Sequence, residues 1–133
     1  MTKLTSEKHT VNKSAEHVFQ FLCDFNHFEP LMPDKVVDWK SDTESCSFNI
    51  QGMAAIGMKF VNKTANSRIE IESSGKNPFD FTLFVNINEK TAESCEVEME
   101  MNADMNPMLA MMAKRPLSNL LKMMVEKLEE LSF

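Results

Sequence analysis

Apolar and polar residues alternate in short segments along most of the first hundred positions of the chain. Alternation with one apolar face is typical of half-buried antiparallel strands. It occurs over residues 4–12, 36–40, 46–50, 56–60, 69–71, 79–87 and 95–101. Short turns separate the last six segments, which leaves no room for helical crossovers. The pattern therefore predicts seven strands, of which the last six form a meander.

Two short helices are expected after the first strand. Ser14 stands where an N-cap is needed, and Glu16 falls in the first turn, where the helix dipole favours an anion. Apolar residues then follow at helical spacing as far as Phe25. Residues 26–32 predict a second short helix that Pro33 closes.

The period changes at the C-terminal end of the chain. Asn106 and Pro107 form a helix start, with a capping side chain followed by a proline at the first helical position. An apolar stripe at spacings of three and four runs from Leu117 to Leu131. Residues 107–131 predict a helix about 37 Å long. Pro116 is expected to kink or split this helix, and we interpret the bend as a way to open a cavity beneath it.

The order of these elements predicts an α+β fold formed by residues 1–133 as one domain. A seven-stranded curved antiparallel sheet with one apolar face needs a cover, and the long helix is the only predicted element large enough to supply it. Fatty-acid-binding proteins share the two short helices but end in strands, and cystatin-like folds place their main helices first. Both fit this order less well.

Four stretches carry a resemblance to a known superfamily: residues 14–22, residues 31–39, residues 46–52 and residues 106–117. Together they resemble the helix-grip fold of the START/SRPBCC superfamily, which includes polyketide cyclases, coenzyme Q-binding proteins and the birch-pollen allergen group. The resemblance implies a ligand cavity between the sheet and the C-terminal helix.

The candidate ligand-binding residues are the apolar side chains that should face this helix, together with the methionines that follow the last strand. An ordinary filled core is the other interpretation of the same side chains. The candidates are Phe48, Ile50, Met58, Phe60, Ile69, Ile71, Phe81, Leu83, Val85, Val97, Met99, Met101, Met108, Met111 and Met112.

Methionine is unusually dense around the start of the C-terminal helix, with six of the twelve methionines between positions 99 and 112. Its flexible, polarizable side chain suits a wall that adapts to varied apolar shapes. The hypothesis is that the cluster forms such a wall at the cavity mouth, and the alternative is that it only fills space in the core.

Charge limits the partners that the chain is expected to have. Twenty acidic against fourteen basic residues give a net charge of −6, which disfavours nucleic acid and anionic membranes. An acidic stripe is expected on the outer sheet face, interpreted as a solvated surface or a docking site for a basic protein. It consists of Glu70, Glu72, Glu96, Glu98 and Glu100. Phe84 on that face is a candidate contact in a homodimer.

The ends and the cysteines indicate a cytoplasmic protein. No apolar leader is visible at the start, and the longest apolar runs are far shorter than a membrane span. The three cysteines have no paired spacing, so reduced and inert thiols are expected.

No residue pattern predicts a metal, a cofactor or a catalytic centre. The histidines lack metal-ligand spacing, the glycines match no nucleotide-binding motif, and the chain has no tyrosine. Binding or carriage of a small apolar or amphipathic molecule is therefore the expected function. A cyclase/dehydratase-like enzyme using Asn49, Gln51 and His27 is one alternative, and a co-chaperone-like interaction module is the other.

Overall fold

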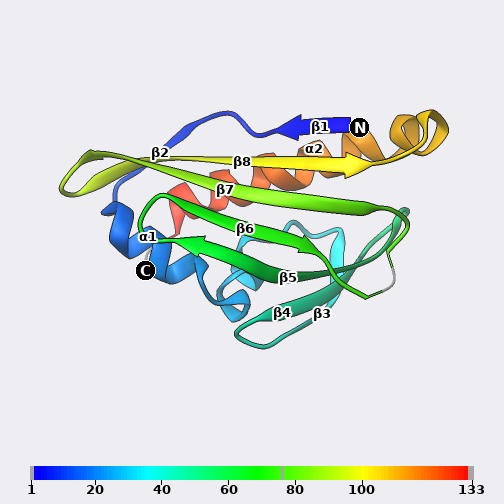
Figure 1. The fold of residues 1–133 in the computed structure, drawn as a ribbon, viewed down its shortest axis with the longest axis horizontal. Helices are drawn as coiled ribbons and strands as arrows, with labels where there is room; N and C mark the ends of the chain where they lie inside the picture. The colour runs from blue at the N-terminus through cyan, green and yellow to red at the C-terminus, as the bar shows by residue number, and fades with distance from the viewer. Residues whose placement is uncertain (1, 76, 132–133) are drawn as a thin grey trace.

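The computed structural model describes residues 2–75 and 77–131, and it has the α+β architecture that the sequence predicts. Figure 1 shows a curved sheet with one long helix behind it. The helical elements are α1 (Ala15–Leu22), the short 3₁₀ helices η1 (Phe25–His27) and η2 (Glu29–Leu31), and α2 (Pro107–Glu130). The strands are β1 (Thr2–Thr5), β2 (His9–Val11), β3 (Val36–Ser41), β4 (Ser45–Ile50), β5 (Ala54–Thr64), β6 (Arg68–Ser73), β7 (Asp80–Thr91) and β8 (Ser94–Asp104).

All neighbouring strands of the sheet are antiparallel, in the order β1-β8-β7-β6-β5-β4-β3. The expected single strand over residues 4–12 is in fact two strands, β1 and β2, which both pair with β8. The break is at Ser6, whose backbone N–H donates to the Met99 carbonyl oxygen at 2.8 Å. The Met99 N–H in turn donates to Ser6 Oγ at 2.8 Å, so a hydroxyl replaces a backbone acceptor where the strand is interrupted.

Side-chain caps start both α-helices as expected. Ser14 Oγ accepts a hydrogen bond from the His17 N–H at 3.1 Å, and Asn106 Oδ1 accepts one from the Leu109 N–H at 2.8 Å. These caps satisfy backbone donors that the first helical turn leaves free. The second short helix expected over residues 26–32 is instead the pair of 3₁₀ turns η1 and η2.

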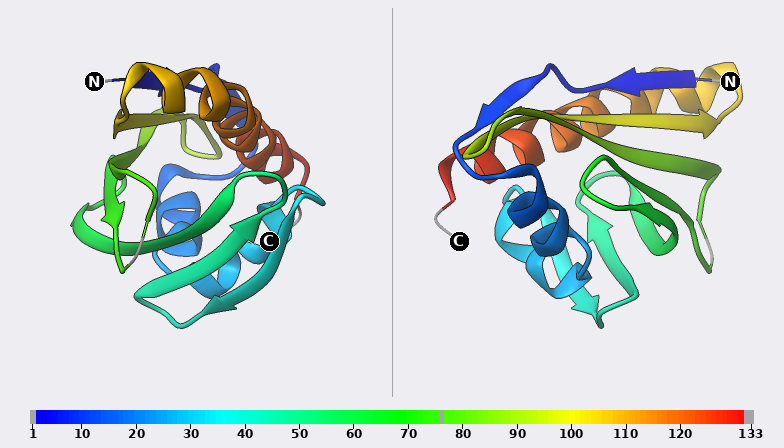
Figure 2. Two further views of the ribbon diagram at one scale, coloured as in Figure 1. Left: turned by 90° about the vertical axis from the view of Figure 1, so that its right-hand side faces the viewer. Right: turned by 60° about the vertical axis from the view of Figure 1, so that its left-hand side comes forward.

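Helix α2 packs against β1, β2, β8 and η2, and the sheet curls around it (Figure 2). Pro116 lies inside α2 without splitting it, because the helix continues from Pro107 to Glu130. In the left panel of Figure 2 the first turns run in a different direction from the rest of the helix. A proline in a helix removes one backbone bond and favours such a bend. The buried stripe consists of Ala113, Leu117, Leu120, Leu121, Met124, Val125 and Leu128.

Candidate functional site

The space between the sheet and α2 is filled by side chains. The cavity that remains there has a volume of about 10 Å³, which is room for roughly one water molecule. Every residue that lines it is apolar: Met32, Phe48, Ile56, Met58, Phe81, Leu83, Met101, Leu117, Leu120, Leu121 and Met124. The ligand-sized internal cavity that the resemblance implied is therefore closed in this structure.

Five of the candidate ligand-binding residues, Phe48, Met58, Phe81, Leu83 and Met101, line this small cavity. Five others are buried in the core away from it. They are Ile69, Ile71, Val85, Val97 and Met99.

Two further candidates lie elsewhere. Ile50 is buried at the end of β4, where it lines a groove on the protein surface. Phe60 is half-buried and stacks on Phe25, with ring centroids 4.1 Å apart. The structure therefore divides the candidates among a core, a surface groove and a peripheral aromatic cluster.

The remaining candidates, Met108, Met111 and Met112, do not face the interior. Their exposed fractions are 74%, 85% and 70%. They occupy the first turns of α2, which lie beyond the tip of β8 in Figure 1. The expectation that these three side chains form an apolar wall at the mouth of the cavity is therefore corrected, because they are exposed to solvent. The spacing of residues along α2 could have predicted this exposure. Ala113 and Leu117 lie on the buried face of the helix, and the three methionines lie on the opposite face.

An open groove of ligand size lies beside the bend of α2. Its volume is about 610 Å³. One wall comes from α2 and the other from the segment that leads into β3 and from the end of β4. The lining residues are Pro33, Asp34, Lys35, Val36, Ile50, Gln51, Arg115, Pro116, Asn119, Leu120, Lys122, Met123 and Glu126.

Backbone and side-chain bonds hold the two walls in place. Lys127 Nζ on α2 donates to the Met32 carbonyl oxygen at 2.9 Å, immediately before the segment that forms the opposite wall. Within that wall, the Val36 N–H donates to the Pro33 carbonyl oxygen at 3.0 Å, and the Gln51 N–H donates to the Lys35 carbonyl oxygen at 2.9 Å. The groove is thus part of the folded framework.

The groove has an apolar floor and a charged rim. Val36, Ile50, Pro116, Leu120 and Met123 supply the apolar surface. Leu120 lines both the groove and the internal cavity, so its side chain separates the two spaces. Sequence reasoning missed this site because three segments far apart in the chain form it. The charged residues of the rim are Asp34, Lys35, Arg115, Lys122 and Glu126.

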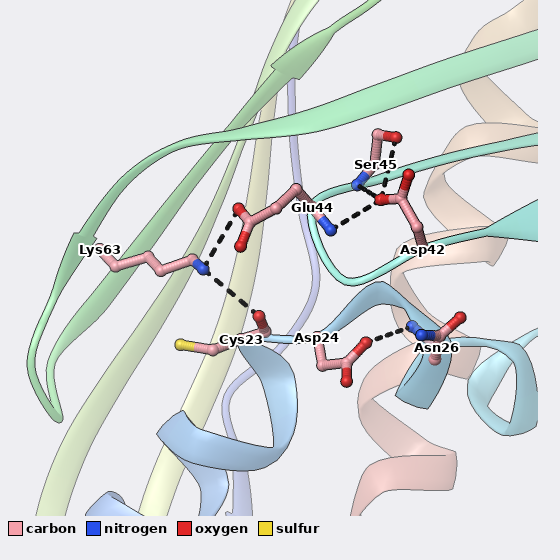
Figure 3. Close-up of polar contacts among 7 residues, drawn as sticks. All are labelled: Cys23, Asp24, Asn26, Asp42, Glu44, Ser45 and Lys63. Atoms are coloured by element: carbon pink, nitrogen blue, oxygen red, sulfur yellow. Dashed lines mark hydrogen bonds and ion pairs between the residues drawn. The ribbon is translucent and has the colours of Figure 1, made fainter.

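A second polar cluster, shown in Figure 3, has a structural role. The Asp42 carboxylate accepts hydrogen bonds from the N–H groups of Glu44 and Ser45, each at 2.8 Å, and these bonds lower the pKa of Asp42. Lys63 Nζ lies 3.6 Å from the Glu44 carboxylate and donates to the Cys23 carbonyl oxygen at 3.4 Å. Burial raises the pKa of the Cys23 thiol. The cluster therefore holds turns together and presents no activated nucleophile.

The weak catalytic candidates are not brought together. Asn49 Nδ2 donates to the Asp38 carboxylate at 3.0 Å. The His27 ring stacks on Phe21, and His27 Nδ1 lies 2.7 Å from the Phe21 carbonyl oxygen. Gln51 alone reaches the groove. Within residues 2–75 and 77–131, no three His, Cys, Asp or Glu side chains are grouped to hold a metal ion.

Basic side chains offset much of the acidic stripe on the outer sheet face. Lys3 lies 2.8 Å from Glu100, Lys59 lies 3.5 Å from Glu72, and Lys90 lies 3.5 Å from Glu96. The Arg68 guanidinium stands over the Phe84 ring at 4.1 Å. None of the described helices combines the length and apolarity that a membrane crossing requires.

Known proteins resemble this chain in structure but not detectably in sequence. No protein-family model matches the chain, and no curated protein matches its sequence. A START superfamily protein from Mycobacterium smegmatis aligns with a TM-score of 0.70 at 15% identity, over 98% of this chain and 99% of that one. Norcoclaurine synthase from Thalictrum flavum, solved with dopamine and hydroxybenzaldehyde, aligns with a TM-score of 0.72 at 12% identity, over 97% and 84%.

A third similar structure is the di-domain ARO/CYC protein BexL. It aligns with a TM-score of 0.73 at 13% identity, over 98% of this chain and 46% of the longer one. The predicted resemblance is confirmed at the level of architecture, because the curved antiparallel sheet and the long C-terminal helix are those of a START/SRPBCC-type fold.

Proposed function

We propose that this START-type chain binds a small apolar or amphipathic molecule in the groove between α2 and residues 33–36. The observation that carries the proposal is the groove itself. Its volume of about 610 Å³ lies within the range of roughly 300–1,000 Å³ that is typical of ligand pockets. An apolar floor with a polar rim is also the usual composition of such sites.

The position of the groove against the core supports a ligand with a sizeable apolar part. Leu120 is the side chain between the groove and the internal cavity, and the wall of that cavity includes Met32, Met58, Met101 and Met124. Methionine side chains repack readily around irregular shapes. An apolar group that displaces Leu120 would therefore extend from the groove into the core.

Neither the internal cavity nor the cysteines of the described chain offer a group suited to general acid–base or nucleophilic catalysis. General acid–base catalysis needs a titratable group within hydrogen-bond reach of the reacting atoms. The wall of the internal cavity is wholly apolar, and the thiols of Cys23, Cys46 and Cys95 have raised pKa values because of burial. Each therefore stays protonated at neutral pH, without the thiolate that a nucleophile needs.

Titration with the neutral dye Nile red tests the proposal. Met123→Trp places a bulky side chain on the groove floor, so we expect it to weaken dye binding by roughly tenfold or more, a loss of about 1.4 kcal/mol. Phe84→Trp, on the outer sheet face, is the matched control and should bind as the wild type does. Absence of saturable binding by the wild type, or equal affinity of the Met123→Trp variant, would overturn the proposal.

A further inference from the structure

The rim of the groove carries two basic side chains that have no partner among the described residues. Within the described part of the chain, neither the Lys35 ammonium nor the Arg115 guanidinium makes a hydrogen bond or an ion pair. Lys122, also on the rim, is instead paired with Glu126 at 3.9 Å across one helical turn. Lys35 and Arg115 stand on opposite walls, because one precedes β3 and the other lies on α2.

The sign of the charge around the groove is opposite to that of the whole chain. The chain has 20 acidic and 14 basic residues, whereas the groove lining has three basic side chains, Lys35, Arg115 and Lys122, against the two carboxylates of Asp34 and Glu126. Pairing of Lys122 with Glu126 leaves two cations and one carboxylate to act on a ligand. The groove lining therefore has a net charge of +1 in a chain of net charge −6, and its two unpaired cations are suited to contact an anion.

We infer that the ligand is an anionic amphiphile, with a carboxylate or phosphate group held between Arg115 and Lys35 and an apolar body on the groove floor. The inference rests on the proposed function and names the class of molecule that this site takes. A guanidinium offers paired donors that match the geometry of both kinds of oxyanion, and an ammonium adds a mobile point charge. Val36, Ile50 and Met123 then cover the apolar body.

The inference also predicts which molecules the groove binds less tightly. A cationic amphiphile would meet Arg115 and Lys35 with like charge, and an uncharged one would gain no contact with either cation. Because the rim is open to solvent, salt should weaken the preference for anions, whereas the contact of the apolar body should persist. Salt therefore separates the head-group contribution from binding of the apolar body.

Displacement of Nile red by four amphiphiles that share one alkyl chain tests this inference. The probes are decanoate, decyl phosphate, decanol and decyltrimethylammonium, each below its critical micelle concentration. At low ionic strength, we expect at least one of the two anions to bind roughly tenfold more tightly than decanol, and the cation to bind more weakly than decanol. Whichever anion binds more tightly identifies the head group, and either result supports the inference.

Variants locate the anion contact. Arg115→Gln and Lys35→Gln should each reduce the preference for the anion over decanol severalfold, and the double variant should abolish it. Lys114→Gln removes the neighbouring charge on α2, which does not line the groove, and should leave the preference unchanged. Equal affinity for decanoate, decyl phosphate and decanol would overturn the anion inference and leave the proposed function standing. Failure of every amphiphile and of Nile red to bind would overturn the proposed function itself.

Discussion

At the scale of the residue, the proposed function makes Leu120 the barrier between the groove and the core. Its side chain lines both the open groove and the closed internal cavity. Leu117, one turn earlier on α2, is also buried and lines the internal cavity but not the groove. Comparing the two leucines therefore separates an effect on stability from an effect on the entry of a ligand into the internal cavity.

We predict that Leu120→Ala and Leu117→Ala destabilise the protein alike, by about 2–5 kcal/mol each, because both leave a cavity in the core. Only Leu120→Ala should join the groove to the internal space and strengthen Nile red binding. Chemical denaturation measures the first effect, and dye titration of the folded variants measures the second. Stronger binding to both variants, or to neither, would show that Leu120 is not the barrier.

The order in which the methionines are oxidised is a second prediction at the scale of the residue. Met108, Met111 and Met112 are largely exposed, whereas Met99 and Met124 are almost wholly buried. Dilute peroxide should therefore oxidise the three exposed thioethers first, with little loss of stability, because sulfoxides disrupt structure mainly when they form in a core. Peptide mass spectrometry of the native protein reads the order directly. Early oxidation of Met99 or Met124 would contradict the described burial.

Titration of the Cys46 thiol is expected to lower the stability of the folded protein at alkaline pH. Burial raises the pKa of its thiol from 9.0 to about 12, and the backbone hydrogen bond with Met58 opposes only part of that rise. Between these two values the unfolded chain has lost the proton that the folded chain retains. The free energy of unfolding therefore falls as pH rises through this window, by at most about 1.4 kcal/mol per pH unit from this thiol.

Cys46→Ala should make this decline shallower than in the wild type. Denaturant unfolding at a series of pH values tests this, and the chain has no tyrosine whose titration would overlap. A shallower slope should remain in the variant, because the pKa values of Cys23 and Cys95 are raised as well. Identical slopes for the two proteins would show that the Cys46 thiol is not shielded as described.

At the scale of the element, Pro116 sets the shape of α2 at the groove. It lies inside the helix, lines the groove and supplies no N–H to the Met112 carbonyl. We predict that Pro116→Ala stabilises the protein by up to about 3 kcal/mol, the propensity difference in a helix interior. A straighter helix should also reshape the groove and weaken Nile red binding.

Ser118→Ala is the control for this change, since it raises helix propensity two residues away without altering the groove lining. It should add about 0.5 kcal/mol at most and leave dye affinity unchanged. A destabilised Pro116→Ala protein would mean that the bend is imposed by packing, and unchanged affinity would mean that it does not shape the groove.

The elements were predictable because their signals are local. Alternation marked the strands, the stripe from Leu117 onward marked the buried face of α2, and Ser14 and Asn106 marked the helix starts. The interruption at Ser6 was not predictable, because it depends on a hydrogen bond to Met99, which is distant in the chain.

The candidate site was predicted in part. The apolar sheet face was identified, but no periodicity reveals whether facing side chains fill the space between a sheet and a helix. Here they do, and the remaining space lies at the surface, where segments distant in sequence meet. The exposure of Met111 was readable from the phase of α2, since the buried Ala113 and Leu117 fix the inward face.

At the scale of the whole molecule, the curved sheet and α2 enclose a filled core, and the groove of the proposed function lies outside it at the surface. The outer sheet face carries ion pairs such as Lys3–Glu100, which neutralise much of its acidic stripe. Exposed pairs of this kind contribute at most about 1 kcal/mol each to stability. They therefore keep this face polar and hydrated more than they stabilise the fold. A ligand that binds only the folded state should stabilise the whole molecule, by about 2.7 kcal/mol at a hundredfold excess over its Kd.

The most direct test of the central claim is a nuclear magnetic resonance titration of the isotope-labelled protein with decanol, which carries no charge and so tests the groove apart from the anion contact. We predict saturable shifts of backbone amides that line the groove, at Val36, Ile50, Gln51, Asn119 and Leu120. Shifts confined to the outer sheet face around Phe84, or no saturable shifts at all, would contradict binding in the groove.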